Sequence, residues 1–558
     1  MPLPSYPPDL AGEWAHLRRR VRSTYTSSQR RGPAPGGAGV VRLDERGRLP
    51  AAVLPESCGA LTGVLDVRSF GAAGDGEADD TEAIQTALDR AREKGGGAVW
   101  IPGGTYSVQA PPLRVYGNTT VSLAPDAVVR RDGERTLLTN GDSEQDLPGY
   151  TGHGRIRLEG GVWDGNGAVV SRHNNILSFG HATGITVRDT VVRDVPGYHA
   201  IELNAVRCAR VVDVRFEGFT DTAGTRSFTE AVQLDLAKSS SHFGEFGPYD
   251  DTTCTDVAFF GCSFTGSETE GARPWPTGIG SHSATLGRSH SDVRILGCHF
   301  EDCSEEGVHA YVWDRVTVQG NTFVDCGGGV CAVSVIDTKP NDTRPPDWGE
   351  PTGCSQPLSD VAVTGNTFTG TGALAPVRIT GHPNGGWVDH VTVTGNTVNG
   401  AARYGVHGYR ARGVVCADNL LSGTSASAVH LDSVTGAGVT GNTVTETGGA
   451  GVYLVDVRDT VVANNSLRGI GHVGLHLQGG GLIRLNDNQV AGADSYGMRV
   501  STGCTGISLT GNRADSGAEG LSITDTCREV VRYGNDLRRS GGLDDASPDP
   551  VTEPADLV

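Results

Sequence analysis

The sequence predicts an all-β protein whose chain winds as a parallel β-helix. A Gly-Asn pair, or a similar one, returns at nearly constant intervals, and each interval holds short β-rich runs and turns without a helical stretch. A period of this length indicates a solenoid. Gly accounts for 81 of the 558 residues and Met for only 2, which favours many short strands joined by tight turns over a helix bundle.

An Asn marks each predicted coil. The steps between successive positions are 45, 30, 23, 23, 23, 23, 24 and 23 residues, and Cys262 and Cys298 hold the same slot further upstream. With three short strands per coil of about 23 residues, we expect each Asn to hydrogen-bond its equivalents in the neighbouring coils and to accept left-handed backbone angles at the corner. The recurring residues are Asn321, Asn366, Asn396, Asn419, Asn442, Asn465, Asn488, Asn512 and Asn535.

One short helix is predicted before the coils, within the segment that begins at Leu65. Asp80 or Thr81 suits its N-terminal cap, and a run of three Gly at 95–97 ends it. A helix here would cover the open end of the β-helix and hide an exposed strand edge. Its apolar stripe consists of Ile84, Leu88 and Ala91.

The same segment carries a resemblance to a known superfamily. The sequence LDVRSFGAAGDGEADDTEAIQTALDRAREKGGGAVWIPGGTYSV from Leu65, together with GVWDGNG at 161–167, resembles the pectate-lyase-like and polygalacturonase-related β-helix proteins. The resemblance implies a right-handed parallel β-helix over about residues 64–540. It says little about the reaction, because one fold hosts many activities.

The first 62 residues resemble a different kind of protein. Trp14, Leu17 and Val21 have a short heptad-like spacing, and a Pro- and Gly-rich linker leads to LDERGRLPAAVLPE. This arrangement is similar to the attachment end of phage tail fibres and tailspikes. It implies a homotrimer on a phage-tail-like or other extracellular particle, made in the cytoplasm without a signal peptide. The alternative is a disordered leader.

We therefore predict three regions: an attachment and oligomerisation segment at 1–62, the right-handed parallel β-helix at 63–540, and a tail at 541–558. The tail, GLDDASPDPVTEPADLV after its first residue, is acidic and contains Pro, so we expect it to be disordered.

Composition excludes several partners. The formal net charge of −19 argues against nucleic acid, which requires a basic face. No apolar run is long enough to insert into a membrane. The 12 Cys lack metal-site spacing, so no catalytic metal and no cofactor is expected, although Ca²⁺ in a loop stays open. Cys303 and Cys326 are one coil apart, as are Cys504 and Cys527, which indicates stacked core residues.

An outward-facing column of polar side chains is predicted from the strand that follows each turn. Runs such as HAIELN, EAVQLD and EGVHAY place apolar residues inward and the intervening residues outward. The predicted column is Glu202, Gln233, Gly280, His309, Ala332, Arg378, His407, His430, Tyr453, His476, Arg499 and Ser522. Such a face, rich in His, Tyr and Arg, suits an extended polymer such as a cell-surface polysaccharide.

Glycoside hydrolysis is the first chemistry that this face predicts. It needs two carboxyl groups that flank the bond. Glu202 and Asp235 are one coil apart and offset by two residues, which places their backbones about 8 Å apart, within the inverting range. A second column of Asp235, His282 and Tyr311 would let the carboxylate tune the His. The predicted catalytic residues are Asp235, Glu202, His282 and His309.

Long insertions single out the middle coils as the binding region. They lie at about 237–253, 265–277, 337–358 and 381–390, and insertions of a solenoid often gather on its binding face. Four of the seven Trp fall in this region, where their flat faces could stack on sugars. The predicted substrate-binding residues are Glu230, Gln233, Tyr311, Trp313, Arg378, Trp275, Trp348, Trp387, His407 and Tyr409.

Two alternatives stay open. β-Elimination on a uronic-acid polymer needs a base, for which His309, His282 and Tyr311 are candidates, and a cation from Arg378 or Lys339. The acidic net charge argues mildly against such a polyanion. The other alternative is a fibre that only binds a glycan. Polygalacturonases carry an adjacent Asp pair and an Arg-x-Lys strand, which QLD at 233–235 and VRI at 377–379 do not reproduce, so the resemblance transfers no catalytic residue.

Overall fold

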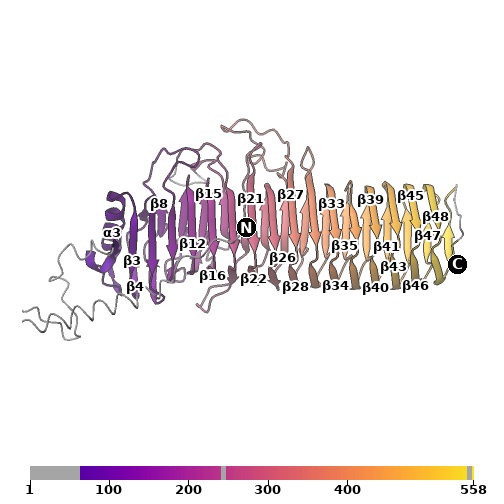
Figure 1. Cartoon of the computed structure of the whole chain (residues 1–558), viewed down its shortest axis with the longest axis horizontal. Coiled ribbons are helices and arrows are strands. Elements are labelled where there is room, and N and C mark those ends of the chain that lie inside the picture. Colours follow the sequence, from indigo (N-terminus) through magenta and orange to yellow (C-terminus); the bar gives the residue numbers. More distant parts are fainter. Residues whose placement is uncertain (1–62, 241–246, 549–555, 558) are drawn as a thin grey trace, which may run out of the picture. The chain divides into compact units, whose positions relative to one another are not determined.

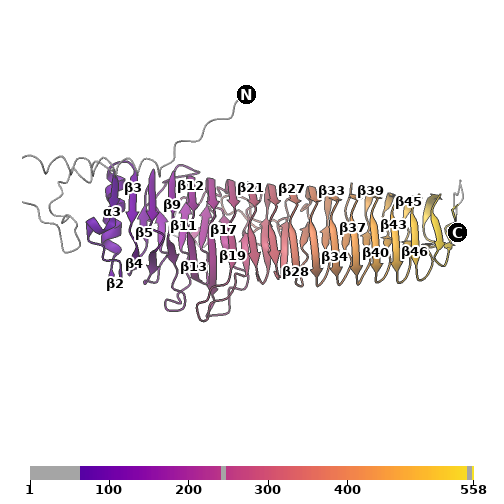
Figure 2. The same cartoon turned by 60° about the horizontal axis from the view of Figure 1, so that its bottom comes forward.

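The protein forms a right-handed parallel β-helix, as predicted. The structure is a computed structural model that describes residues 63–240, 247–548 and 556–557, so the predicted attachment segment at 1–62 lies outside the described residues. Within the described part, three strands make one coil, and the coils stack into a rod that begins at the only α-helix (Figures 1 and 2).

Each strand pairs in parallel with the equivalent strand of the next coil, which creates three long sheets. Sheet A consists of β1 (Val64–Asp66), β3 (Gly97–Ile101), β6 (Thr119–Leu123), β9 (Ile156–Glu159), β12 (Thr183–Arg188), β15 (Arg207–Val212), β18 (Thr255–Phe260), β21 (His290–Leu296), β24 (Trp313–Gln319), β27 (Leu358–Thr364), β30 (Val388–Thr394), β33 (Ala411–Ala417), β36 (Gly438–Thr440), β39 (Arg458–Ala463), β42 (Gly481–Asn486), β45 (Thr505–Thr510) and β48 (Arg528–Tyr533).

Sheet B consists of β2 (Asp75–Asp79), β4 (Gly104–Val108), β7 (Ala127–Arg131), β10 (Val162–Asp164), β13 (Val191–Pro196), β16 (Arg215–Thr220), β19 (Ser263–Thr265), β22 (His299–Glu301), β25 (Thr322–Val324), β28 (Thr367–Thr371), β31 (Thr397–Ala401), β34 (Leu420–Thr424), β37 (Thr443–Thr447), β40 (Ser466–Ile470), β43 (Gln489–Ala493), β46 (Arg513–Ser516) and β49 (Asp536–Arg539).

Sheet C consists of β5 (Leu113–Val115), β8 (Leu138–Asn140), β11 (Leu177–Gly180), β14 (Ile201–Asn204), β17 (Glu230–Asp235), β20 (Thr277–Gly280), β23 (Glu306–Tyr311), β26 (Gly328–Val333), β29 (Val377–Thr380), β32 (Val406–Tyr409), β35 (Val429–Asp432), β38 (Val452–Val455), β41 (Leu475–Gln478), β44 (Met498–Ser501), β47 (Leu521–Ile523) and β50 (Leu543–Asp545).

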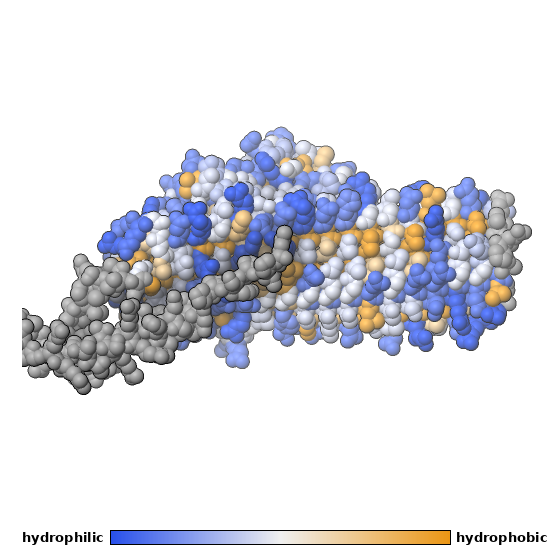
Figure 3. Space-filling view, viewed as in Figure 1, coloured by the Kyte–Doolittle hydropathy of each residue, from blue (hydrophilic) through white to orange (hydrophobic). Residues whose placement is uncertain are grey.

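The core runs along the axis of the rod and is built from stacked side chains of equivalent positions. The clearest stack lies in sheet B, where successive Phe rings are 4.7–4.8 Å apart and nearly parallel. Alternation along each strand places these rings inside and polar residues outside. The outer surface is accordingly mostly hydrophilic, with narrow hydrophobic bands (Figure 3). The stacked rings belong to Phe216, Phe264, Phe300, Phe323 and Phe368.

The predicted Asn ladder is present and almost fully buried. Asn419, for example, donates from its backbone N and from Nδ2 to Oδ1 of Asn442, at 3.1 and 2.9 Å. The left-handed conformation falls one residue earlier than predicted, on Asp418 (φ 55°) and Gly441 (φ 67°). The preceding residue therefore turns the corner, while the Asn side chain joins the coils.

The ladder ends within the region that we predicted to be disordered. Asp556 accepts from the backbone N and from Nδ2 of Asn535 at 3.0 and 2.9 Å, in the place of a further Asn. Strand β50 also belongs to this region and pairs with β47. The described parts of the tail thus continue the last coil and satisfy its open hydrogen bonds.

The predicted helix is confirmed as α3 (Thr81–Glu93), which follows the 3₁₀ turn η2 (Val67–Phe70). Its apolar stripe is buried against the first coil. Asp80 precedes the helix but does not cap it, because its carboxylate accepts from the backbone N of Ala73 at 2.6 Å and from that of Gly74. Of the helices in the described ranges, none has the length and apolar character needed to cross a membrane.

The predicted Cys stacks are also confirmed. Every Cys in the described ranges is a free thiol, and most are buried in the core. Cys303 and Cys326 lie in neighbouring coils, as do Cys504 and Cys527, close enough for each pair to interact through its side chains.

Long connections flank the outer face of sheet C in the first half of the rod. Those that follow β8, β17 and β26 rise on one side, and those that follow β16 and β19 lie on the other side (Figures 1 and 2). The first group is held together by direct contacts: Nζ of Lys238 donates to the carbonyl of Asn341 at 2.7 Å, and Nε1 of Trp348 donates to the carbonyl of Lys238 at 2.7 Å. These connections thus border β14 to β23 on two sides.

Candidate functional site

The outer face of sheet C aligns polar residues of successive coils at the predicted column. Strand pairing replaces the predicted Ala332 with Cys331, because Ala332 points into the core. The observed column is Ser178, Glu202, Gln233, Gly280, His309, Cys331, Arg378, His407, His430, Tyr453, His476, Arg499 and Ser522.

Glu202 on β14 is a half-buried carboxyl group of this face. Oγ of Ser178 donates to Oε2 of Glu202 at 2.9 Å, and Nδ2 of Asn175 donates to the same oxygen. Burial, with a smaller contribution from the charge of Asp235, raises the pKa of Glu202 to about 7. This carboxyl group can therefore give or take a proton near neutral pH.

Asp235 does not reach the surface as the sequence analysis expected. Its side chain lies under the outer face with only 2% of its area exposed. Oδ1 accepts from the backbone N of Leu236 at 2.8 Å and from Oγ of Ser283, and Oδ2 accepts from Nε2 of Gln233 at 3.0 Å. Asp235 can thus act on Glu202 through its charge, but its own oxygens are occupied by the protein.

His282 and Glu230 form an ion pair beside Glu202. Nδ1 of His282 lies 3.0 and 3.1 Å from the two oxygens of Glu230. Burial opposes both charges, yet the mutual attraction raises the pKa of His282 to about 9 and lowers the pKa of Glu230 to about 2. The Glu230 side chain is 2% exposed and that of His282 is 31% exposed, so the pair presents a positive imidazolium to the solvent.

Two residues that the sequence analysis missed support this arrangement from the preceding turn. His199 is buried, its Nδ1 lies 2.7 Å from the carbonyl of Glu230, and burial lowers its pKa to about 4. Asn175 accepts from the backbone N of His199 at 3.1 Å while its Nδ2 holds Glu202. Asn175 precedes β11 and His199 precedes β14. The inward–outward alternation that predicted the column applies only within the strands, so it could not find these two residues.

Aromatic side chains are present at the site, but they are not the predicted Trp. Phe228, from the connection that follows β16, is 46% exposed, and its ring meets His282 edge-on at 5.6 Å. Tyr198 is 37% exposed, and the guanidinium of Arg226 lies over both rings at 4.6 and 5.2 Å. These exposed rings can contact the apolar faces of sugars.

Three predicted binding residues are corrected by their burial. Trp275 and Trp313 are fully buried in the core, and Nε1 of Trp313 donates to Oγ of Ser281 at 2.8 Å. Tyr311 is 1% exposed and donates to Asp342 at 2.8 Å, under the connection that follows β26. Trp275 precedes β20 and Trp313 begins β24, where the side chains turn into the core, whereas Tyr311 ends β23 beneath the connection.

The other predicted aromatic residues lie away from Glu202. Trp348 is 41% exposed on a long connection. Trp387 is half-buried beneath the guanidinium groups of Arg410 and Arg412, at 4.8 and 5.1 Å. Tyr409 on β32 is half-buried beside Thr380 and Asp432.

A ladder of stacked rings occupies the column beyond Arg378. His407, His430, Tyr453 and His476 stack at 4.8–5.2 Å, and burial lowers the pKa of His407 to about 4. Because each ring covers the face of the next, the ladder offers only ring edges to a ligand.

A second Glu–His pair lies two coils beyond the first. Nδ1 of His309 is 3.3 Å from Oε2 of Glu306, and the other oxygen of Glu306 accepts from Arg378. These contacts lower the pKa of Glu306 to about 2, although burial alone would raise it. Gly280 separates the two pairs: a Cβ on this residue would lie 3.0 Å from both the Glu230 and the His309 side chains.

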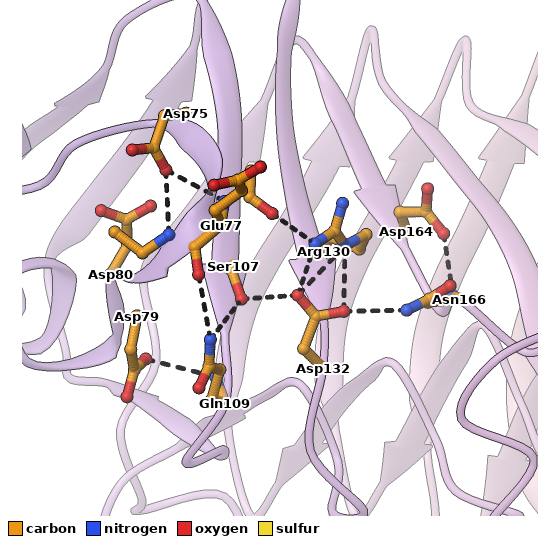
Figure 4. Close-up of polar contacts among 12 residues, drawn as sticks. Asp75, Glu77, Asp79, Asp80, Ser107, Gln109, Arg130, Asp132, Asp164 and Asn166 are labelled. Carbon is orange, nitrogen blue, oxygen red and sulfur yellow. Dashed lines mark hydrogen bonds and ion pairs between the residues drawn. The ribbon is translucent and has the colours of Figure 1, made fainter.

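Sheet B carries a different polar cluster, on the outer face of the first coils. Asp132 accepts from Ser107, Arg130 and Asn166 at 2.5–2.9 Å (Figure 4). Asp164 is held by the backbone N of Asn166 at 2.8 Å and by a bidentate ion pair with Arg193. The carboxylates of Asp132 and Asp164 are satisfied by neighbouring groups, so these residues join successive coils.

Two family models match the chain. The model described as a right handed beta helix region matches residues 377–537, and the model described as rhamnogalacturonase A/epimerase, pectate lyase-like matches residues 64–125. The second match covers the same opening segment that carries the resemblance in the sequence.

Relatives in sequence share only part of the chain. Plasmin and fibronectin-binding protein A of Streptococcus pneumoniae is 26% identical over 295 residues, which cover 46% of this chain and 39% of that protein. A mannuronan C5-epimerase of Azotobacter vinelandii is 30% identical over 146 residues, which cover 24% of this chain and 15% of the epimerase. The chain thus spans less than half the length of these curated relatives.

The crystal structure of PfbA, a surface adhesin of Streptococcus pneumoniae, superposes with a TM-score of 0.55 and 21% identity, covering 72% of this chain and 90% of the adhesin. A likeness of this degree shows the fold. The three parallel sheets, the matched β-helix region and this superposition together identify the chain as a right-handed parallel β-helix protein with a pectate-lyase-like opening segment.

Proposed function

We propose that this protein binds an acidic polysaccharide along the outer face of sheet C and cleaves it by β-elimination, with Glu202 as the acid–base group. The observation that carries the proposal is the placement of two groups next to Gln233. The half-buried Glu202, with a pKa of about 7, pairs with Gln233 across the strands, and Nε2 of the 31% exposed His282 lies 3.4 Å from Nε2 of Gln233. A carboxylate that titrates near neutral pH suits proton transfer, and a fixed cation suits an anionic substrate.

The roles follow from the charges of the two groups. The His282 imidazolium pairs with the carboxylate of a uronic-acid unit, which makes the adjacent carbon-bound proton more acidic. Ionised Glu202 takes this proton, a double bond forms, and the bond to the leaving glycosidic oxygen breaks. Glu202 then returns the proton to that oxygen from the same face, so one carboxyl group serves both transfers.

The surroundings of Glu202 favour an acidic substrate in spite of the negative net charge. Arg226 lies beside His282, and Arg378 follows five coils beyond Glu202 along the same face. Their acidic partners Glu230 and Glu306 are buried beneath them. The names of similar proteins, a mannuronan epimerase and a rhamnogalacturonase A/epimerase family, support a glycan as the ligand.

Hydrolysis is the second candidate, and one observation favours it. A protonated Glu202 could act as the general acid, and the Asp235 backbone lies about 8 Å away, as inverting enzymes require. Against this, a base must contact the attacking water, and the oxygens of Asp235 are held by Leu236, Gln233 and Ser283. Elimination needs no second accessible carboxylate, so it fits the geometry better.

The assembly and location of the protein are proposed from the resemblance of residues 1–62 to tail-fibre attachment segments. The protein would then be displayed as a homotrimer on a virion or another extracellular particle. The non-catalytic alternative is a module that only binds its ligand. That ligand would be a glycan or, as the name of the similar pneumococcal protein says of that protein, plasmin and fibronectin.

Incubation with uronic-acid polysaccharides separates these possibilities. We expect ultraviolet-absorbing unsaturated ends to accumulate with the wild type and not with Glu202→Gln, which keeps the size of the side chain. New reducing ends without ultraviolet absorption would establish hydrolysis instead. Polymer retention without either product, on a panel that includes neutral glycans, would establish a binding module and overturn the enzymatic proposal.

A further inference from the structure

Three different metal-binding side chains converge on the outer face of sheet C, one and two coils beyond His282. Glu306 and His309 lie on β23, and Cys331 occupies the next outward position on β26. One potential ligand atom from each of the three lies within 4.8 Å of the other two. We propose that Glu306, His309 and Cys331 form a binding site for a divalent transition-metal ion of the zinc type.

The spacing of the donor atoms suits such an ion. A tetrahedral ion with bonds of about 2.05 Å to nitrogen and oxygen separates these ligands by about 3.3 Å, and the corresponding separation from a thiolate sulfur is about 3.6 Å. Nδ1 of His309 and Oε2 of Glu306 are already 3.3 Å apart. Binding therefore requires small side-chain movements and leaves the strands in place.

The donor set selects the class of metal. A thiolate, an imidazole and a carboxylate together favour zinc and its neighbours over Ca²⁺ and Mg²⁺, which prefer oxygen ligands alone. The sequence showed no such site because its members are 3 and 22 residues apart, without the close Cys and His pairs of metal motifs. Only the stacking of β23 and β26 brings them together.

Arg378 supplies the support that a ligand carboxylate needs. It donates to Oε1 of Glu306, which leaves Oε2 directed toward His309. This contact orients the carboxylate in the manner of an outer-shell partner. Arg378 is also close to Cys331, where its positive charge favours the thiolate that a metal requires, whereas burial of Cys331 raises the pKa of the thiol.

The site has an open side. His309 is 26% exposed, whereas Glu306 and Cys331 are buried, so the imidazole is the side of the site that meets the solvent. Three protein ligands with one open side leave a coordination position for water or for a ligand oxygen. Since the first Glu–His pair lies across Gly280, a polymer on this face would pass the metal. The metal site itself rests on the donor geometry alone and does not depend on the proposed elimination.

Cobalt provides a direct test, because a thiolate bound to Co²⁺ gives a charge-transfer absorption in the near ultraviolet. Purified full-length protein, stripped with a chelator and kept reduced, is titrated with Co²⁺ and then with Zn²⁺. We expect one equivalent of Co²⁺ to produce the band and Zn²⁺ to abolish it. Cys331→Ser should remove the band, and His309→Ala should weaken binding by more than the roughly 10- to 100-fold typical of an outer-shell partner.

Cys354→Ser is the matched control, because Cys354 is the exposed thiol in the described ranges and the most obvious adventitious ligand. The band should persist unchanged in this variant. Circular dichroism of each variant establishes that the β-helix is intact. The inference is overturned if the wild type gives no thiolate band, if the band disappears in Cys354→Ser, or if folded His309→Ala binds Co²⁺ as tightly as the wild type.

Discussion

Replacement of Glu230 by Gln tests whether the His282 imidazolium drives the reaction. Gln keeps the size of the side chain, and its Oε1 can still accept from Nδ1 of His282. The substitution removes the charge that raises the pKa of His282 to about 9, while the burial that lowers this pKa remains. We therefore expect the pKa of His282 in the variant to fall toward its ordinary value of 6.5.

The size of the effect follows from two titrations. Activity requires ionised Glu202, with a pKa of about 7, and protonated His282, with a pKa of about 9, so the wild type should be most active between these values. At about pH 8, roughly 80% of wild-type molecules hold both forms. With the His282 pKa at about 6.5, this fraction is roughly 3%, which predicts a loss of about 30-fold at that pH.

The assay is the rate of formation of unsaturated ends as a function of pH, together with an NMR titration of His282. The resonance is assigned with His282→Gln, because the chain contains 16 His. We expect the upper limb of the pH profile and the NMR pKa to move down together. A variant that retains a His282 pKa near 9, or that works at about pH 8 within twofold of the wild type, would refute the role given to the ion pair.

The remaining predictions concern the same face and the assembly. Glu202→Gln should lower the elimination rate by about 10²- to 10⁴-fold, the range for removal of an acid–base group, while retention of the polymer on the protein in a gel-shift assay stays unchanged. Asp235→Asn should lower the pKa of Glu202 and so move the lower limb of the pH–rate profile to lower pH, because it removes a neighbouring negative charge; complete loss of activity in a folded variant would instead support hydrolysis with Asp235 as the base. Binding of a uronate polymer, measured by isothermal titration calorimetry, should weaken as the salt concentration rises from about 0.15 to 1 M, because the screening length falls from about 8 to 3 Å. An affinity that does not change with salt would exclude an anionic substrate. Light scattering should give about three times the chain mass of 58.1 kDa for the full protein, and a monomer would contradict the tail-fibre resemblance.

The fold could be predicted from the sequence because it repeats. Successive coils present the same alternation, and the coils from Asn321 onward share the same Asn, so the pattern of one coil supports that of its neighbours. The single misassigned position of the column is an exception: the run GGVCAV offers small residues at every place, and only pairing with β23 and β29 shows that Cys331 faces outward and Ala332 inward. The left-handed conformation was predicted for the Asn and lies on the residue before it. The two residues recur at the same interval, so the period alone cannot tell which of them turns the corner.

The site was harder to predict, because accessibility depends on what covers an outward position. The alternation along β14 and β17 places both Glu202 and Asp235 at outward positions. Asp235 is nevertheless buried, in contact with Gln233 and Ser283, whereas Glu202 is half-buried. The exposed rings of Phe228 and Tyr198 come from a connection and a turn that carry no periodic signal. Conversely, Trp275 and Trp313 stood out by residue type and are core residues.

The charge of the site illustrates why net charge is a weak guide to the partner of a β-helix. The chain carries 19 more negative than positive charges, and the outer face of sheet C contains several of the acidic residues. Glu230 and Glu306, however, are 2% and 5% exposed beneath His282, His309 and Arg378, which are 26–31% exposed. Glu230 holds the His282 imidazolium in place and Glu306 holds the Arg378 guanidinium, and these two cations are what the solvent meets. A face built on carboxylates thus presents positive charge to a ligand, and for this reason the elimination of an acidic polymer, the weaker alternative by composition, becomes the better one by geometry.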